Sequence, residues 1–137
     1  MSAHPPVATV ACHEFRAHEG RLELRLRVLP QGRDLHASLL GGEWHVGATA
    51  LSGPNGVTQV SERPAHREGA LAAMVARRLA TGLSCAVSVS AGIHFADITR
   101  AEIAAVERLA ESLVEEALAA LSSRRTSHAE HGRTGRV

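Results

Sequence analysis

One segment of this chain restricts its fold more than any other. From Arg21 to Leu29, charged and aliphatic residues alternate almost without fault. Successive side chains of a β-strand point to opposite faces, so this alternation predicts a strand with one buried face. The aliphatic row must be covered by other elements, which favours a layered domain. Its members are Leu22, Leu24, Leu26 and Val28.

The segment after this strand predicts a hairpin. Residues 30–33 have the composition of a turn, and Gly41-Gly42 is a pair that tolerates the positive φ of a tight hairpin loop. We therefore expect paired strands over residues 34–40 and 43–51. In this register Ser38 faces His45, and Leu26 lies beside Ala37. A slip by one residue would invert every side chain, so the shared apolar face supports the register.

The predicted register also assigns faces to the chemically interesting residues. His36, Glu43 and His45 share the face away from the core, and Gly47 leaves a gap beside His36. Trp44 falls on the opposite, apolar face.

The rest of the chain predicts two helices and two more strands. A strand is expected over residues 7–15, a loop over 52–64, a helix over 67–81 ended by Gly82, and a strand over 83–90. Thr99 and Glu102 have the spacing of a capping box, which begins a second amphipathic helix. We expect an α+β domain with a mixed, mainly antiparallel sheet of four to five strands and two helices packed on one face. It should span residues 7–122, with flexible tails at 1–6 and 123–137.

Composition excludes several classes of function. The sequence has no Tyr, one Trp and two Phe, which argues against nucleic-acid binding by base stacking, and its net charge of +1 gives no reason to expect a polyanion. No apolar run approaches the ~20 residues that span a bilayer. The first residues lack the basic and apolar regions of a signal peptide, so we expect a cytoplasmic protein with no nucleic-acid or membrane partner.

Two histidines in glycine-rich surroundings are the strongest candidates for a site. His45 lies between Gly42 and Gly47, and His94 follows Gly92. Imidazole is a common ligand of divalent metals, and a nearby glycine lets a ligand or a second backbone approach. Adding His36, Glu43 or His66 would give a set suited to zinc, manganese or iron. The same residues also fit surface histidines on an open sheet face.

A second candidate precedes the first predicted helix. His66-Arg67-Glu68 would bring Arg67 and free backbone amides to the helix start, where a phosphate can bind. An ordinary solvated helix start explains the same residues.

Several short motifs, taken in order, resemble a known family. They are similar to the small "D" subunit, a prenylated-flavin chaperone, that accompanies UbiD-type decarboxylases of gallate, vanillate and related hydroxyarylic acids. The resemblance covers roughly residues 20–110. The motifs are Leu35-His36-x-Ser38-Leu39, Gly41-Gly42-Glu43-x-His45-Val46-Gly47-Ala48, His66-Arg67-Glu68, Ser90-Ala91-Gly92-Ile93-His94 and Ile98-Thr99-x-x-Glu102-Ile103.

The resemblance implies a helper protein with no catalytic residues of its own. It would bind prenylated FMN, or FMN, with a divalent metal ion, and deliver or mature the flavin for the large decarboxylase subunit. A flavin prenyltransferase would supply the cofactor. By the same resemblance, Arg67 would meet the flavin phosphate and three glycines would allow close approach. The metal or flavin site would comprise His45 and His94, with His36, Glu43 and His66 as second choices. His66 would also belong to the cofactor-binding residues, and the glycines are Gly42, Gly47 and Gly92.

Two other functions fit the residues. One is a small metal-dependent enzyme in which a histidine-held ion activates water or a carbonyl. The other is a structural subunit that stabilises a decarboxylase. If flavin does bind, Trp44 on the apolar face cannot stack on its ring, so we expect a site covered by a second copy in a homo-oligomer.

Overall fold

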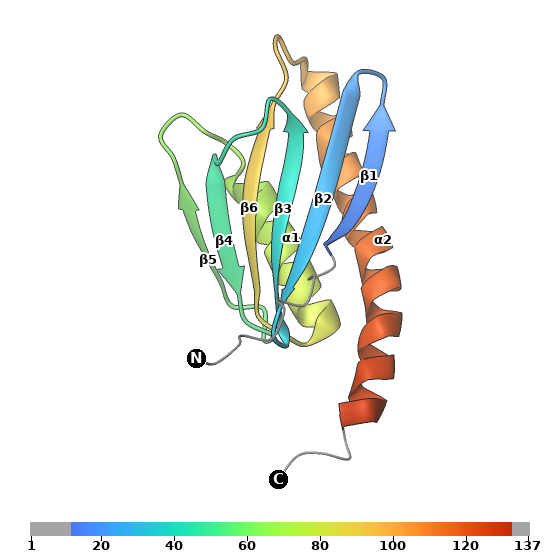
Figure 1. The fold of residues 1–137 in the computed structure, drawn as a ribbon. Coiled ribbons are helices and arrows are strands. Elements are labelled where there is room, and N and C mark those ends of the chain that lie inside the picture. Colours follow the sequence, from blue (N-terminus) through green and yellow to red (C-terminus); the bar gives the residue numbers. More distant parts are fainter. Residues whose placement is uncertain (1–11, 133–137) are drawn as a thin grey trace, which may run out of the picture.

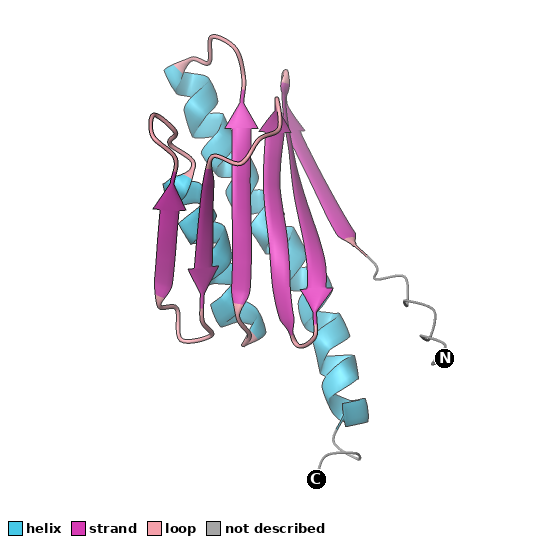
Figure 2. Ribbon diagram, turned by 60° about the vertical axis from the view of Figure 1, so that its left-hand side comes forward, coloured by secondary structure: helices cyan, strands magenta, loops and turns pink. Residues whose placement is uncertain are grey.

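The computed structural model describes residues 12–132, with side chains described as far as residue 123. Its elements form a sheet with both helices against one face (Figures 1 and 2). The described elements are β1 (His13–Glu19), β2 (Leu22–Gln31), β3 (Asp34–Gly42), β4 (Ala48–Ser52), β5 (Thr58–Glu62), α1 (Gly69–Leu83), β6 (Val87–His94) and α2 (Arg100–Gly132).

The strand order explains how one face is buried. The described residues form a six-stranded sheet in the order β1-β2-β3-β6-β4-β5, in which β3 and β6 pair in parallel and the other described pairs are antiparallel. The α+β class and the two helices on one face are therefore confirmed, but the sheet has more strands than the predicted four to five. The missed strand is β5, which lies within the predicted loop 52–64. Its exposed side chains carry no buried alternation, because it is an edge strand.

The predicted hairpin between residues 34–40 and 43–51 is wrong. β6 lies between β3 and β4, and residues 43–47 cross over its end. Val87, Val89 and Ala91 are almost fully buried, so β6 gains most by occupying the middle of the sheet. Ser38 accordingly pairs with Ser90 of β6 and not with His45.

The predicted register between β2 and β3 is shifted by two residues. Leu26 pairs with Leu39, and Ala37 pairs with Val28, because the turn is tighter than expected. Gln31 pairs with Asp34 across Gly32, whose φ is +61°. A shift of two preserves which face each side chain takes, so the predicted apolar face is correct.

Trp44 lies on the other side of the sheet from its predicted position. Its ring is 45% exposed, and the guanidinium carbons of Arg25 and Arg27 stand 5.5 and 4.6 Å from the ring centroid. These arginines alternate with buried leucines, so they occupy the open face of the sheet. The contacts are cation–π in geometry.

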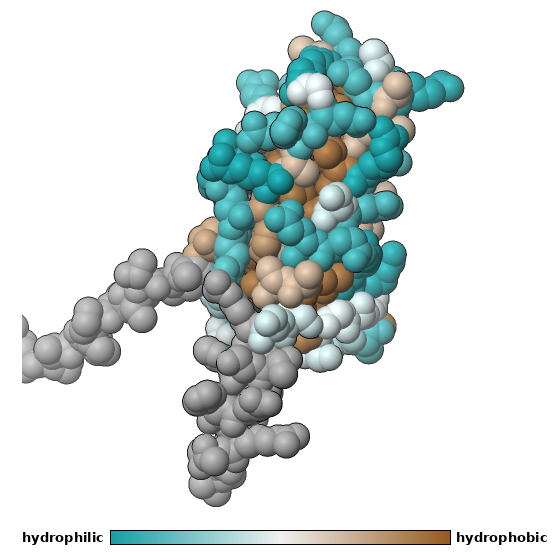
Figure 3. Space-filling model, turned by 90° about the vertical axis from the view of Figure 1, so that its right-hand side faces the viewer, coloured by the Kyte–Doolittle hydropathy of each residue, from teal (hydrophilic) through white to brown (hydrophobic). Residues whose placement is uncertain are grey.

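The helices cover the inward-facing rows of the sheet. Leu24, Leu26 and Leu39 are fully buried against residues such as Leu79 and Leu113 of the helices. On the side that carries β1 and α2, apolar side chains show between polar ones (Figure 3). Phe15, Ala17 and Leu109 are only partly buried against the core.

The helix ends correct one prediction and confirm another. Gly82 lies inside α1, which ends at Leu83 with Ser84 in the left-handed region. A Cβ on Gly82 would stand 2.5 Å from Cδ2 of Leu118, so this glycine lets α2 pack closely. The capping box is confirmed, since Thr99 and Glu102 exchange two hydrogen bonds of 3.1 Å.

The ends of the chain leave the domain limits as a prediction. The backbone of α2 continues to Gly132, past the predicted domain limit at residue 122. Residues 7–11 of the predicted first strand lie outside the described residues, as do residues 1–6 and 133–137. None of the described helices is long and apolar enough to cross a membrane.

Candidate functional site

A five-residue loop, 43–47, crosses the end of β6 and forms one wall of the candidate site. Both ends of this crossing loop are held by backbone hydrogen bonds. The N–H of Glu43 donates to the carbonyl of His94 at 2.9 Å, and the N–H of Gly47 donates to the carbonyl of Ala91 at 2.9 Å. The loop therefore places His45 directly over the C-terminal end of β6, the strand that carries His94.

The three glycines of the predicted cofactor site face the protein itself. A Cβ on Gly92 would stand 1.5 Å from the carbonyl oxygen of His45, and one on Gly42 would stand 2.0 Å from that of His94. Gly42 also has a φ of +61°, which favours glycine. None of the three lines the cavity described below. Their observed role is to let the crossing loop lie close to β6 and α1.

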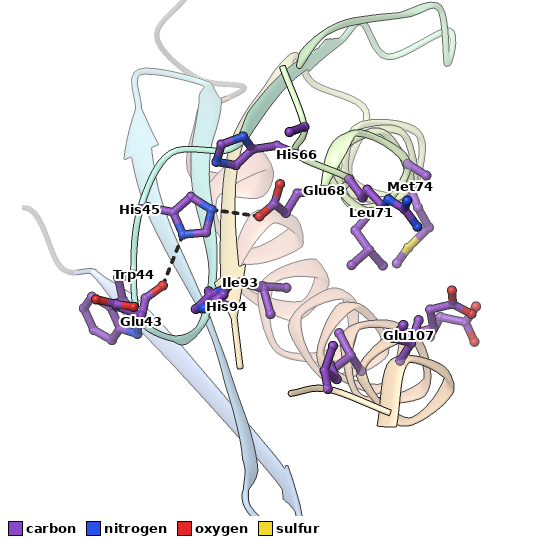
Figure 4. Close-up of a pocket in the computed structure, with 17 residues that line it drawn as sticks. Glu43, Trp44, His45, His66, Glu68, Leu71, Met74, Ile93, His94 and Glu107 are labelled. Carbon is purple, nitrogen blue, oxygen red and sulfur yellow. Dashed lines mark hydrogen bonds and ion pairs between the residues drawn. The ribbon is translucent and has the colours of Figure 1, made fainter. Parts of the chain in front are cut away.

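His45 forms a hydrogen-bonded pair with Glu68, which stands at the start of α1. Nε2 of His45 lies 2.8 Å from Oε1 of Glu68, and Nδ1 lies 3.1 Å from the carbonyl oxygen of Glu43 (Figure 4). A carbonyl oxygen only accepts, so Nδ1 must donate to it. A single hydrogen atom then joins Nε2 and Oε1 in the second hydrogen bond of the ring. Both ring nitrogens are thus engaged by the protein.

The carboxylate of Glu68 is enclosed. Its side chain is 10% exposed, and Oε2 has no hydrogen-bond partner among the described residues. A Cβ on Gly47 would stand 2.2 Å from this oxygen. Buried carboxylate oxygens usually accept hydrogen bonds, so the unpartnered Oε2 is an exception. The Glu68 side chain is held by its hydrogen bond to His45 and by packing against Gly47.

The residues just before α1 supply positive and polar groups. The ring of His66 stands 5.2 Å from that of His45, and its Nδ1 donates to the carbonyl of Pro64, which leaves Nε2 for a ligand. Arg67 makes no hydrogen bond or ion pair within the described part of the chain. The first amide of the helix is taken, because the N–H of Gly69 donates to Glu62 at 2.7 Å. An anion here would therefore depend on Arg67 and His66 rather than on that amide.

A cavity of about 900 Å³ lies between the crossing loop, the start of α1 and the first turns of α2. His45 and His66 stand at one side of it, and Glu107 projects from α2 at the other (Figure 4). Its remaining lining is mostly aliphatic. The larger aliphatic lining residues are Leu71, Met74, Ile93, Ile98, Ile103 and Val106.

The predicted metal ligands do not form one group. His45, His94 and Glu43 line the cavity, but His36 does not. It alternates with the buried Leu35 and Ala37 and so faces the open side of the sheet, where Nδ1 lies 2.6 Å from Oγ of Ser88. Gly42 lies six positions further along β3, about 20 Å from His36.

Metal binding at this set therefore finds no support in the geometry. Both ring nitrogens of His45 are engaged, and Glu43 meets His45 through its backbone carbonyl. In the described part of the chain, no three His, Cys, Asp or Glu side chains are grouped so that they could hold a metal ion.

Glu68 is the site residue that the sequence reasoning missed. It appeared there only as part of a helix start. The sequence did contain a signal, because Glu68 directly follows two candidate site residues, His66 and Arg67, in the same motif. Which partner it takes depends on the crossing loop, and that was not visible in the predicted hairpin.

The fold and this cavity define a small α+β protein with an open, largely apolar cavity at one end of its sheet. A family model described as "Prenylated flavin chaperone LpdD-like domain" matches residues 18–122. The chain belongs to this family, and membership supports a role as a flavin chaperone.

Two further comparisons concern curated proteins and solved structures. No curated protein matches the chain. A chain in the structure titled "Crystal Structure of a Novel Chaperone Complex for Yeast 20S Proteasome Assembly" has a TM-score of 0.50 and 10% sequence identity, and the match covers 83% of this chain and 96% of that chain. At this identity the similarity shows the fold alone.

Proposed function

We propose that this protein binds prenylated FMN, or FMN, in the cavity beside the crossing loop and passes it to a UbiD-type decarboxylase. The observation that carries the proposal is an open, mainly aliphatic cavity of about 900 Å³ in a member of this family. Ligand pockets typically measure about 300–1,000 Å³ and combine apolar walls with a few polar groups. The cavity fits both criteria.

The charges around the cavity favour one orientation of the flavin. Arg67, without an ion pair of its own among the described residues, and Nε2 of His66 are the groups suited to the phosphate. Glu107 and Glu111 line the α2 side, where no cation of the described residues lines the cavity and the carboxylates would repel a phosphate. On the other side the cavity is lined by two acids, Glu43 and Glu68, and Glu68 is paired with His45. The isoalloxazine ring would then lie against aliphatic side chains. Trp44 also lines the cavity, but its ring is packed against Arg25 and Arg27.

Delivery to a partner is consistent with how the cavity is built. Ile103 lines it and is 45% exposed, so part of the apolar wall is uncovered in the isolated chain. A decarboxylase large subunit or a second copy of this chain would cover that wall, and a flavin prenyltransferase would supply the cofactor. Light scattering measures whether the flavin-loaded protein is a homo-oligomer. No metal ion enters this proposal, because the histidine set does not converge.

The test compares two arginine variants after co-expression with a flavin prenyltransferase. Arg67→Gln removes the cation that lines the cavity. Arg78→Gln removes a cation that pairs with Glu115 and does not line the cavity. We expect Arg67→Gln to retain about tenfold less flavin by absorption spectrum, since a hydrogen bond to a charged group is worth about 1.5–3 kcal/mol. Equal retention by both variants would contradict the assignment of the phosphate end, and a wild-type protein without flavin would contradict the function.

A further inference from the structure

The crossing loop is anchored differently at its ends and in its middle. Its ends are tied by the backbone hydrogen bonds of Glu43 and Gly47 to β6. Next to Gly47, Val46 accepts a hydrogen bond from the Arg63 side chain at 3.1 Å. In the middle, the hydrogen bonds described for the loop are those of the His45 ring, while the Trp44 ring packs against Arg25 and Arg27 on the open face of the sheet. On the cavity side, the position of the loop therefore depends on what holds the His45 ring.

Glu68 is the residue that holds it. The carboxylate comes from the start of α1, reaches under Gly47 and meets Nε2 of His45 at 2.8 Å. Burying a carboxylate with one oxygen unpartnered is unfavourable, so the position of Glu68 lowers the stability of the folded state. The absence of a side chain at Gly47 provides the space. The two motifs that carry these residues are separated in sequence, and both Glu68 and His66 of one contact His45 of the other.

We propose that Glu68 is a positioning residue: by fixing His45 it holds the crossing loop as a wall of the cavity. The first half of this inference, the fixing of the loop, is independent of any ligand. The second half, that loop position determines how well flavin is retained, rests on the proposed function.

The sequence contains its own probe of the loop. Trp44 is the single tryptophan of the chain and lies next to His45, stacked with Arg25 and Arg27. Its emission maximum and its quenching by iodide report the loop in flavin-free protein. Glu68→Ala removes the partner of His45, and we expect red-shifted emission and increased quenching.

Glu68→Gln separates positioning from packing. The Gln amide N–H can donate to Nε2 while Nδ1 of His45 still donates to Glu43, so both ring nitrogens of His45 keep a suitable partner. We expect Glu68→Gln to restore the wild-type emission and quenching. Glu68→Gln removes the negative charge at the start of α1 and keeps the hydrogen bond to His45. Rescue by this variant would therefore show that the hydrogen bond matters, and not the charge alone.

A matched control uses Glu62, the last residue of β5, whose carboxylate reaches the start of α1. Glu62 accepts a hydrogen bond from the Gly69 amide and does not contact His45. Glu62→Ala should lower the stability of the protein and leave the Trp44 signal of the folded state unchanged. If Glu68→Ala also left that signal unchanged, or if Glu62→Ala shifted it equally, the positioning role would be refuted.

Flavin retention forms the second readout. After co-expression with a prenyltransferase, we expect Glu68→Ala to retain about tenfold less flavin and Glu68→Gln to retain nearly the wild-type amount. A shifted Trp44 signal with unchanged retention would overturn the link between loop and cofactor. A wild-type protein that retains no flavin, together with a shifted signal in Glu68→Ala, would overturn the proposed function and leave the positioning role standing.

Discussion

Gly47 lies against the carboxylate of Glu68 so closely that a Cβ at this position would stand 2.2 Å from Oε2 and 2.5 Å from Cδ. The glycine of one motif and the acid of another are therefore fitted to each other. This relation explains why the crossing loop tolerates no side chain at its last residue.

The first prediction concerns Gly47→Ala. The new methyl group would displace the Glu68 carboxylate and break its contact with His45, and overpacking of this kind costs about 1–3 kcal/mol in the free energy of unfolding. Urea denaturation measures the loss. In a Glu68→Ala background the same change should cost clearly less, because the carboxylate is gone. Additive losses in the double variant would show that the two residues do not interact. Gly53→Ala, whose Cβ would meet only the side-chain oxygen of Asn55 at 3.1 Å, is the control.

Gly92→Ala should be more damaging than Gly47→Ala. Its Cβ would stand 1.5 Å from the carbonyl oxygen of His45, and backbone cannot move aside as a side chain can. We expect a loss of free energy of unfolding at or above the upper end of about 1–3 kcal/mol. The crossing loop must also leave β6, so the Trp44 emission of the folded fraction should shift to the red. A stable variant with unchanged Trp44 emission would mean that the loop does not lie where the structure puts it.

The stability of the protein in acid should depend on Glu102. The guanidinium of Arg21 and then the backbone N–H of Thr99 lower the pKa of Glu102 from its ordinary 4.5 to about 2. A carboxyl with a lowered pKa in the folded state stabilises it above the ordinary pKa, and that contribution is lost as pH falls through about 2. Glu102→Gln should therefore flatten the decline of the urea midpoint between these values. Glu116→Gln, an exposed glutamate on the same helix, should leave the decline unchanged. Identical acid profiles for wild type and Glu102→Gln would contradict this prediction.

Substitution of His45 and of His36 should affect flavin retention differently, because the two residues lie on different sides of the sheet. His45 lines the cavity, whereas His36 contacts Ser88 on the open face. We expect His45→Ala to lower flavin retention after co-expression with a prenyltransferase, and His36→Ala to leave it at the wild-type level. Absorption spectra of the purified variants measure both. A loss of flavin in His36→Ala would return this residue to the site.

Much of the layer structure was predictable because it follows from local periodicity. The alternation of residues 21–29 correctly predicted a strand and its buried face, and the Thr99 and Glu102 pair correctly predicted the start of α2. The edge strand β5 was not predictable in this way, since exposed residues have no alternation to detect. The roles of the candidate site residues stay predictions, but five of them line one cavity together with Glu68: they are Glu43, His45, His66, Arg67 and His94.

What the sequence determined by itself was most of the elements, the buried face of the first strand pair and the motifs rich in glycine and histidine, because these depend on neighbours within a few residues. Only the tertiary structure decided what those motifs meet. The insertion of β6 between β3 and β4 turned an expected hairpin into a crossing loop, placed the His45 carbonyl over Gly92 and brought the Glu68 carboxylate under Gly47. Strand order is set by how the whole sheet best buries its apolar rows against two helices. No short segment contains that information, so the partner of His45 became visible only in the fold.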